Sequence, residues 1–268
     1  MYVDSHCHLS FPALRDNLTA IRAAMTAAQV DRALCICTTL EEFEAVHALA
    51  TGHDNFWCSA GVHPDNEGVR EPGLYDLLAL AALPRVVAIG ETGLDYFRLN
   101  GRSVAEMEWQ RERFRVHIRA ACATALPLVV HTRSASHDTV AILREEGASA
   151  PGGVFHCFTE TEAVARAALD LGFYISFSGI LTFKTASDLR DVARFVPLDR
   201  CLIETDSPYL APVPFRGKTN SPAYVPFVAR QIAELKGLPV EQVARATSRN
   251  FERLFKLPVM PEHSVTQA

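Results

Sequence analysis

The chain has 268 residues, 49% hydrophobic and 21% charged, which is enough apolar material for one large domain or two small ones. Its formal net charge of −5 argues against broad electrostatic binding of duplex nucleic acid, which needs a basic face. No apolar run reaches the roughly 18–20 residues of a membrane span, and the first residues lack the pattern of a signal peptide. We expect a cytoplasmic protein with no membrane contact and no obligate protein partner.

Eight short runs have the composition of β-strands, and each is followed by a polar turn and then by helical periodicity. The predicted strands are 2–9, 32–39, 56–64, 86–95, 127–133, 153–158, 174–180 and 201–208. The predicted helices are 18–29, 41–50, 74–83, 104–125, 136–146, 160–171, 186–195 and 225–235, followed by a last helix at about 240–254. Several strand runs, such as Val86-Val87-Ala88-Ile89, are apolar on both faces, as is typical of parallel strands buried under helices.

This alternation predicts a closed (β/α)8 TIM barrel in one domain, residues 1–257, with an extra C-terminal helix packed outside the barrel. Residues 258–268 are expected to form a frayed tail. A doubly wound open sheet is the alternative fold, but it does not explain the polar residues at the strand ends. The seven cysteines lie mostly in apolar runs without a CxxC pair, so we expect reduced thiols rather than disulfides or a cysteine zinc site.

In a barrel of this kind the active site forms at the carboxyl ends of the strands. Histidines and carboxylates gather at these predicted ends. They are His6 and His8, His63, Glu91, His131, His156, and Glu204 with Asp206. Because side chains on a strand alternate faces, His6 and His8 should point the same way. A single histidine at a strand end is more often a core or surface residue, but this many together indicate a metal site.

Imidazole and carboxylate ligands suit Zn²⁺ or another first-row ion, and carboxylate-rich sites also admit Mg²⁺ or Mn²⁺. Four histidines, one glutamate and one aspartate exceed what one tetrahedral ion requires. Two divalent metal ions bridged by a carboxylate fit this inventory better.

The residues at these strand ends belong to longer motifs. The motifs are Asp4-Ser5-His6-Cys7-His8, Gly61-Val62-His63-Pro64, Ile89-Gly90-Glu91-Thr92-Gly93-Leu94-Asp95-Tyr96, Phe155-His156-Cys157-Phe158, Tyr174-Ile175-Ser176-Phe177-Ser178-Gly179-Ile180 and Glu204-Thr205-Asp206-Ser207-Pro208-Tyr209-Leu210-Ala211-Pro212. Together they resemble the motifs of the TatD family of metal-dependent deoxyribonucleases, within the amidohydrolase-like barrel superfamily. The resemblance extends from Asp4 to about Asn250.

The resemblance implies a role for each of six ligands. His6, His8 and Asp206 would hold the first ion, and Glu91 would bridge both ions. His131 and His156 would hold the second ion. Asp206 would also orient and deprotonate the attacking water.

Other positions at the strand ends are candidates for substrate binding or support. Glu204 could accept a hydrogen bond from a ligand histidine, or form a simple buried ion pair. His63 is not needed as a ligand, so we expect it to contact a phosphate or the leaving group. Arg133 is a candidate phosphate fork, and Ser207 is also expected to bind substrate. Further residues could contact nucleic acid or be ordinary loop or core residues, namely Phe97, Lys184, Tyr209, Arg216, Lys218 and Asn220.

The first functional hypothesis is a metal-dependent hydrolase of phosphodiesters, a deoxyribonuclease that trims single-stranded DNA from the 3′ end with a two-metal-activated water. The alternative is a metal-dependent ester or amide hydrolase, such as an aminoacyl-tRNA deacylase. A third hypothesis is a non-catalytic metal-binding or nucleic-acid-binding protein, which the complete ligand set disfavours. The sequence leaves the native metal and the oligomeric state open.

Overall fold

The computed structural model describes residues 1–258 and contains one eight-stranded parallel sheet, in which each strand pairs with the next in chain order. The strands are β1 Tyr2–Cys7, β2 Val30–Cys35, β3 Phe56–Ala60, β4 Val86–Asp95, β5 Leu128–Arg133, β6 Gly153–Phe155, β7 Tyr174–Phe177 and β8 Cys201–Ile203. The ring closes just beyond β8, because the Asp206 amide donates to the His6 carbonyl at 3.0 Å and the His8 amide donates to the Ser207 carbonyl at 2.9 Å. The predicted (β/α)8 barrel is confirmed.

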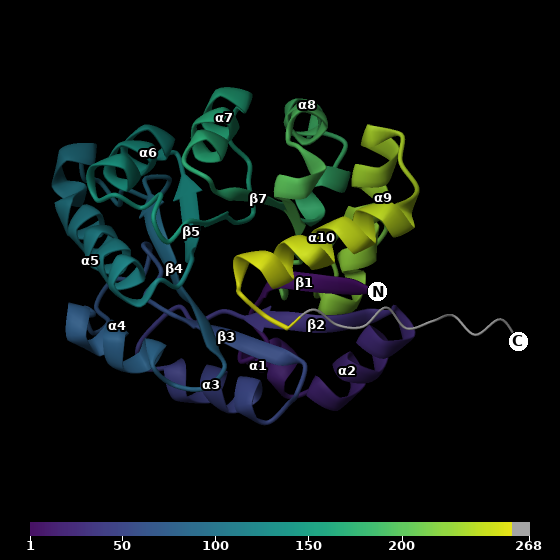
Figure 1. The fold of residues 1–268 in the computed structure, drawn as a ribbon, viewed down its shortest axis with the longest axis horizontal. Coiled ribbons are helices and arrows are strands. Elements are labelled where there is room, and N and C mark those ends of the chain that lie inside the picture. Colours follow the sequence, from purple (N-terminus) through teal and green to yellow (C-terminus); the bar gives the residue numbers. More distant parts are fainter. Residues whose placement is uncertain (259–268) are drawn as a thin grey trace, which may run out of the picture.

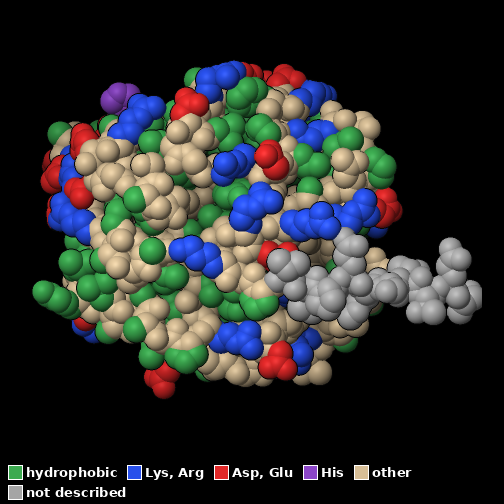
Figure 2. Space-filling model, viewed as in Figure 1, with side chains coloured by type: hydrophobic (Ala, Val, Ile, Leu, Met, Phe, Trp, Pro, Cys, Tyr) green, Lys and Arg blue, Asp and Glu red, His purple; other side chains and the backbone are tan. Residues whose placement is uncertain are grey.

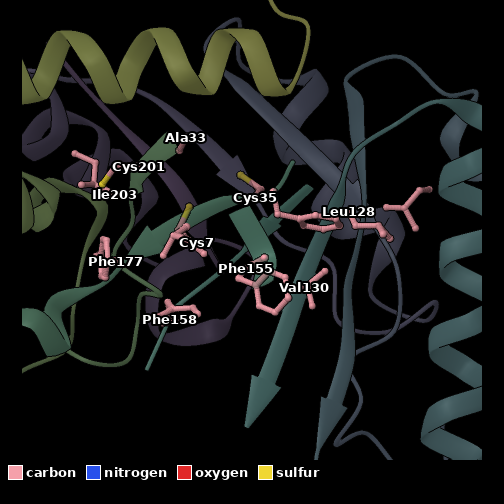
Figure 3. Close-up of a cluster of buried hydrophobic side chains, with 14 of the residues drawn as sticks. Cys7, Ala33, Cys35, Leu128, Val130, Phe155, Phe158, Phe177, Cys201 and Ile203 are labelled. Carbon is pink, nitrogen blue, oxygen red and sulfur yellow. The ribbon is translucent and has the colours of Figure 1, made fainter. Parts of the chain in front are cut away.

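An outer ring of helices surrounds the strands (Figure 1). The helices are α1 Pro12–Arg15, α2 Leu18–Ala27, α3 Phe43–Thr51, α4 Leu74–Ala81, α5 Glu108–Thr124, α6 Ser136–Glu145, α7 Glu162–Asp170, α8 Ser187–Phe195 and α9 Val225–Lys236. The main core lies between this ring and the sheet. It includes the thiols of Cys7, Cys35 and Cys201, which Figure 3 shows beside Phe155 and Phe177.

Helix α10, Val240–Leu254, lies across the amino-terminal end of the barrel (Figure 1). Phe251, Leu254 and Phe255 form a cluster there with buried strand side chains, including Val3 and Leu34. The helix therefore lies outside the barrel and covers its amino-terminal end, which we call the floor. Figure 2 shows this floor face, which carries several Lys and Arg side chains. The carboxyl ends of the strands lie at the other end of the barrel.

Most predicted strands extend further at their carboxyl ends than the strands of the structure, and most predicted helices differ from the observed helices by a residue or two at one end. Strands β6 and β8 end at Phe155 and Ile203, because Cys157 and Asp206 take left-handed backbone angles, with φ of 43° and 54°, that leave the strand. The predicted helix 104–125 is preceded by a 3-10 turn, Val104–Met107, and begins at Glu108.

Within residues 1–258 no helix is both long and apolar enough to cross a bilayer. The predicted cytoplasmic location stays a prediction, and so does the domain boundary at residue 257. Most of the predicted tail, residues 259–268, lies outside the part of the chain that the structure describes.

Candidate metal centre

The ends of β1, β4 and β8 bring four donor atoms together at the mouth of the barrel, by which we mean the carboxyl ends of its strands. The Nε2 atoms of His6 and His8 lie 3.3 Å apart. Asp206 Oδ1 lies 3.5 Å and 3.3 Å from these two nitrogens, and Glu91 Oε2 lies 3.4 Å and 4.0 Å from them. We call these atoms the first donor group.

The other oxygen of Glu91 faces a second set of nitrogens. Glu91 Oε1 lies 2.7 Å from His156 Nε2, 3.3 Å from His131 Nδ1 and 3.3 Å from His63 Nε2. We call Glu91 Oε1, His131 Nδ1 and His156 Nε2 the second donor group. Because each donor group takes one oxygen of the same buried carboxylate, the structure brings all six predicted ligands into one cluster around Glu91.

Two further carboxylates hold the rings of the second donor group. Asp95 Oδ2 lies 3.0 Å from His131 Nε2, so it receives the ring proton there and leaves Nδ1 facing Glu91. Glu204 Oε1 lies 3.3 Å from His156 Nδ1 and accepts the Cys157 amide at 2.8 Å. The predicted position of Glu204 beside a ligand histidine agrees with this contact. Asp95 was not among the predicted site residues, although it lies in the motif from Ile89 to Tyr96.

His63 lies beside the second donor group but presents the wrong tautomer for a metal ligand. Its Nδ1 accepts the backbone amide of Asp65 at 3.0 Å, so a neutral ring carries its proton on Nε2. That proton points toward Glu91 Oε1. The imidazole is therefore a hydrogen-bond donor into the mouth rather than an electron-pair donor to an ion.

The electrostatics of the cluster require positive charge. Burial alone would raise the pKa of Glu91, but His156, His63 and His6 outweigh it and hold that pKa well below its usual value. Burial alone would lower the pKa of His156, but Glu91 and Glu204 raise it well above its usual value. In the metal-free protein, protonated histidine thus balances the buried carboxylates. Divalent cations would supply the same charge between the same atoms, so the donor set fits them.

A glycine allows β4 and β5 to approach closely enough to form the second donor group. Gly93 pairs with His131 in the sheet and has a φ of 131°. A Cβ atom at this position would lie 2.0 Å from the His131 carbonyl oxygen. Only glycine fits here without displacing the strand that carries His131.

A cleft of about 780 Å³ opens over the cluster, within the range of ligand-binding sites. Arg133 and Tyr209 line this cleft, as do His63 and five of the six predicted ligands, His6 lying beneath. Ser207 does not reach the cleft, because its side chain is fully buried, so the structure contradicts its prediction as a substrate contact. Asn220 is also fully buried and donates to the carbonyls of Thr205 and Tyr209, which is a structural role.

Comparison with known proteins identifies the family. The sequence profile of the TatD related DNase family matches residues 3–256. The chain belongs to this family. Metal-dependent hydrolase YcfH of Escherichia coli strain K12 is a TatD-family relative with 49% identity over 259 residues, spanning 95% of this chain and 96% of the relative. The "3'-5' ssDNA/RNA exonuclease TatD" of Citrobacter rodentium is 36% identical over 235 residues, spanning 85% and 88%.

Solved structures agree with the TatD assignment. The crystal structure of YJJV, a TatD homolog from Escherichia coli K12, superposes with a TM-score of 0.88 at 29% identity and covers 96% of this chain and 98% of that one. A hydrolase TatD family protein from Entamoeba histolytica superposes with a TM-score of 0.79 at 21% identity, covering 94% and 97%, and supports the fold alone. The chain is thus a TatD-family metal-dependent hydrolase with a (β/α)8 barrel.

Proposed function

We propose that this chain hydrolyses phosphodiester bonds of single-stranded DNA from the 3′ end, at a site that holds two divalent ions. The observation that carries this proposal is the position of Glu91, whose two oxygens face two separate donor groups. The TatD relative named as a 3′–5′ exonuclease on single-stranded nucleic acid supports the choice of substrate.

Six residues would hold the ions in this proposal. His6, His8 and Asp206 would hold the first ion, and His131 and His156 the second. Glu91 would contact both. Bound in this way, Zn²⁺, Mg²⁺ or Mn²⁺ supplies positive charge for the phosphodiester oxygens and lowers the pKa of a coordinated water.

Asp206 is suited to orient the attacking water and accept its proton. Its side chain is 16% exposed, against 3% for Glu91, so it is the carboxylate ligand that reaches furthest into the cleft. Burial alone would raise the pKa of Asp206, but the hydrogen bond from His8 and the charges of His6 and His156 lower it. The carboxylate is therefore ionised near neutral pH and can accept a proton.

His63 and Arg133 would contact the phosphate. The Nε2 proton of His63 can be donated in a hydrogen bond to a phosphoryl oxygen or to the leaving oxygen. The guanidinium of Arg133 lies 3.6 Å from the centre of the Phe97 ring, an arrangement that leaves its N–H groups free to contact a phosphate from the side. Neither residue holds an ion in the proposed site.

A substrate panel tests the proposal. The purified protein, supplied with Mg²⁺, Mn²⁺ or Zn²⁺, is given a 5′-labelled single-stranded oligonucleotide, an aryl ester, an anilide and an aminoacyl-tRNA. We expect progressive shortening of the oligonucleotide, abolished by EDTA, and little release from the other substrates. If aminoacyl-tRNA is deacylated faster than the oligonucleotide is cleaved, the proposal is wrong and the chain is instead an ester hydrolase.

A further inference from the structure

The cleft above the donor groups has two chemically different walls. One wall, which we call the apolar wall, consists of Phe11, Ile180, Tyr209 and Leu210. The other, which we call the basic wall, contains Arg98 and Arg133. Within residues 1–258, these two arginines are the lysine or arginine residues that line the cleft. The two donor groups lie between these walls, so a substrate bound at the donor groups contacts apolar side chains on one side and arginines on the other.

The apolar wall stands beside the first donor group. The ring of Phe11 stacks on His8, with centroids 4.7 Å apart. Tyr209 follows Asp206 in a tight turn, in which its amide donates to the Asp206 carbonyl at 3.0 Å. The Tyr209 ring meets Phe11 edge-on at 6.4 Å and is 55% exposed. An aromatic face is therefore open to the cleft next to the first donor group.

Two contacts fix the backbone of the turn that carries Tyr209. Buried Asn220 donates to the carbonyls of Thr205 and Tyr209, at 2.8 Å and 2.6 Å. The backbone of Leu210 also lies close to Gly179, where an added Cβ would lie 2.1 Å from the Leu210 carbonyl oxygen. The exposed ring is thus held by a fixed backbone, which lowers the entropic cost of stacking a ligand on it.

The basic wall stands beside the second donor group. Arg133 comes two residues after His131 and lies over the exposed ring of Phe97. Arg98 is 66% exposed and lies 4.0 Å from Asp65, two residues after His63. Two arginine side chains can therefore follow a phosphate backbone that leaves the cluster on this side.

We propose that the apolar wall binds the base of the terminal nucleoside, chiefly on Tyr209, while the basic wall holds the phosphates of the remaining strand. This inference rests on the proposed function. A phosphodiester placed across both donor groups extends one ester arm toward each wall. Only the basic wall offers positive charge to a further phosphate. The nucleoside on the apolar wall must therefore lack a second phosphate, and only the terminal nucleoside of a DNA strand does. Aromatic faces stack on any base, so the wall selects ends without selecting sequence.

The test compares two single-stranded oligonucleotides that differ only at the 3′ end, one with a normal terminal nucleoside and one with an abasic terminal unit. We expect the wild-type protein with Mn²⁺ to cleave the normal end with a kcat/KM at least about fivefold higher. Tyr209→Ala should remove most of this preference by raising KM for the normal end, while Tyr209→Phe should keep it. Tyr75→Ala is the matched control, because Tyr75 is 85% exposed on α4 and does not line the cleft.

Two further measurements separate the base contact from the proposed function. A 3′-terminal 2-aminopurine should be quenched on binding to the Asp206→Asn protein, and the quenching should be lost when Tyr209→Ala is added. Circular single-stranded DNA should resist cleavage. Equal wild-type rates on normal and abasic ends would overturn the inference while leaving hydrolysis from the 3′ end intact. Rapid cleavage of the circle would overturn both the inference and the 3′-end assignment. Failure of the wild-type protein to cleave any oligonucleotide would overturn the inference and the proposed function together.

Discussion

Asp95 lies outside both donor groups, yet it determines which nitrogen of His131 faces Glu91. Its Oδ2 takes the His131 Nε2 proton at 3.0 Å, and its Oδ1 accepts the Phe97 amide at 2.9 Å, so the carboxylate is held from both sides. A second carboxylate, Glu204, does the same for His156. The second donor group therefore depends on two carboxylates that contact its histidine rings at the nitrogens facing away from Glu91.

Replacing Asp95 should weaken binding of the second ion. Asp95→Asn keeps the size of the side chain but removes the charge that fixes the His131 tautomer, so we expect roughly 10- to 100-fold weaker affinity for one of two ions. Isothermal titration with Mn²⁺ measures both sites. Asp138→Asn is the control, because Asp138 accepts from Tyr96 at 2.9 Å without contacting the cluster. Two unchanged binding constants in Asp95→Asn would refute the role.

Metal binding should release protons near neutral pH. Carboxylates raise the pKa of His156 well above its usual value, so in the metal-free protein the ring is protonated at pH 7. A ligand nitrogen must be unprotonated, so an ion expels this proton and apparent affinity increases as pH rises toward the raised pKa. Calorimetry in buffers of different ionisation enthalpy counts the protons. Proton uptake on binding, or affinity that falls with rising pH, would contradict this assignment.

Strand periodicity and barrel topology predicted which residues gather at the mouth, but not every side-chain contact there. The six predicted ligands follow from the topology, because a closed barrel brings the carboxyl ends of its strands together. Ser207 was predicted as a substrate contact, but its side chain is fully buried next to Asp206, whose left-handed φ of 54° lies beyond the end of β8. Asp95 was missed because its contact with His131 depends on the β4–β5 register, which pairs Gly93 with His131.

At the scale of elements, the approach of β4 to β5 decides whether the second donor group forms. Gly93→Ala would place a Cβ 2.0 Å from the His131 carbonyl oxygen at a φ of 131°. We expect a loss of more than about 3 kcal/mol in the free energy of unfolding, since both strain and a backbone clash must be relieved. Urea denaturation monitored by circular dichroism measures this loss.

The control for this change is Gly147→Ala. Gly147 also has a positive φ, 71°, but no atom lies within 4 Å of an added Cβ. Its replacement should cost only about 1–2 kcal/mol of backbone strain. If the two variants are equally stable, the close approach at Gly93 does not constrain β5.

The element order was predictable because buried parallel strands and amphipathic helices alternate with distinct periods. Element ends were less predictable. The helix expected at 104–125 begins at Glu108 instead, because the amide and hydroxyl of Ser103 both donate to Glu106 Oε2 and hold a preceding 3-10 turn. These hydrogen bonds compete locally with helix continuation, and the helical periodicity does not reveal them.

For the molecule as a whole, the floor and the mouth of the barrel have separate tasks. Helix α10 closes the floor through Phe251, Leu254 and Phe255, and the donor groups occupy the opposite end. This arrangement agrees with the general separation of stability and chemistry between the two ends of such barrels. Changes at the floor should therefore affect stability without changing the metal site.

Phe251→Ala tests this separation. The ring is fully buried and contacts Phe255 with centroids 4.8 Å apart. We expect its removal to lower the free energy of unfolding by about 3–5 kcal/mol, while the folded variant still binds the same number of Mn²⁺ ions. Tyr75→Ala, at an 85% exposed position, should change stability by no more than about 0.5 kcal/mol. Loss of metal from folded Phe251→Ala protein would show that the two ends are coupled.

A crystal structure of the protein with Mn²⁺, with anomalous data collected at the manganese edge, tests the two-ion site directly. We expect two anomalous peaks on opposite oxygens of Glu91. One should lie among His6, His8 and Asp206, and the other between His131 and His156. A single peak, or a peak held by His63 in place of His131, would contradict the two-ion site.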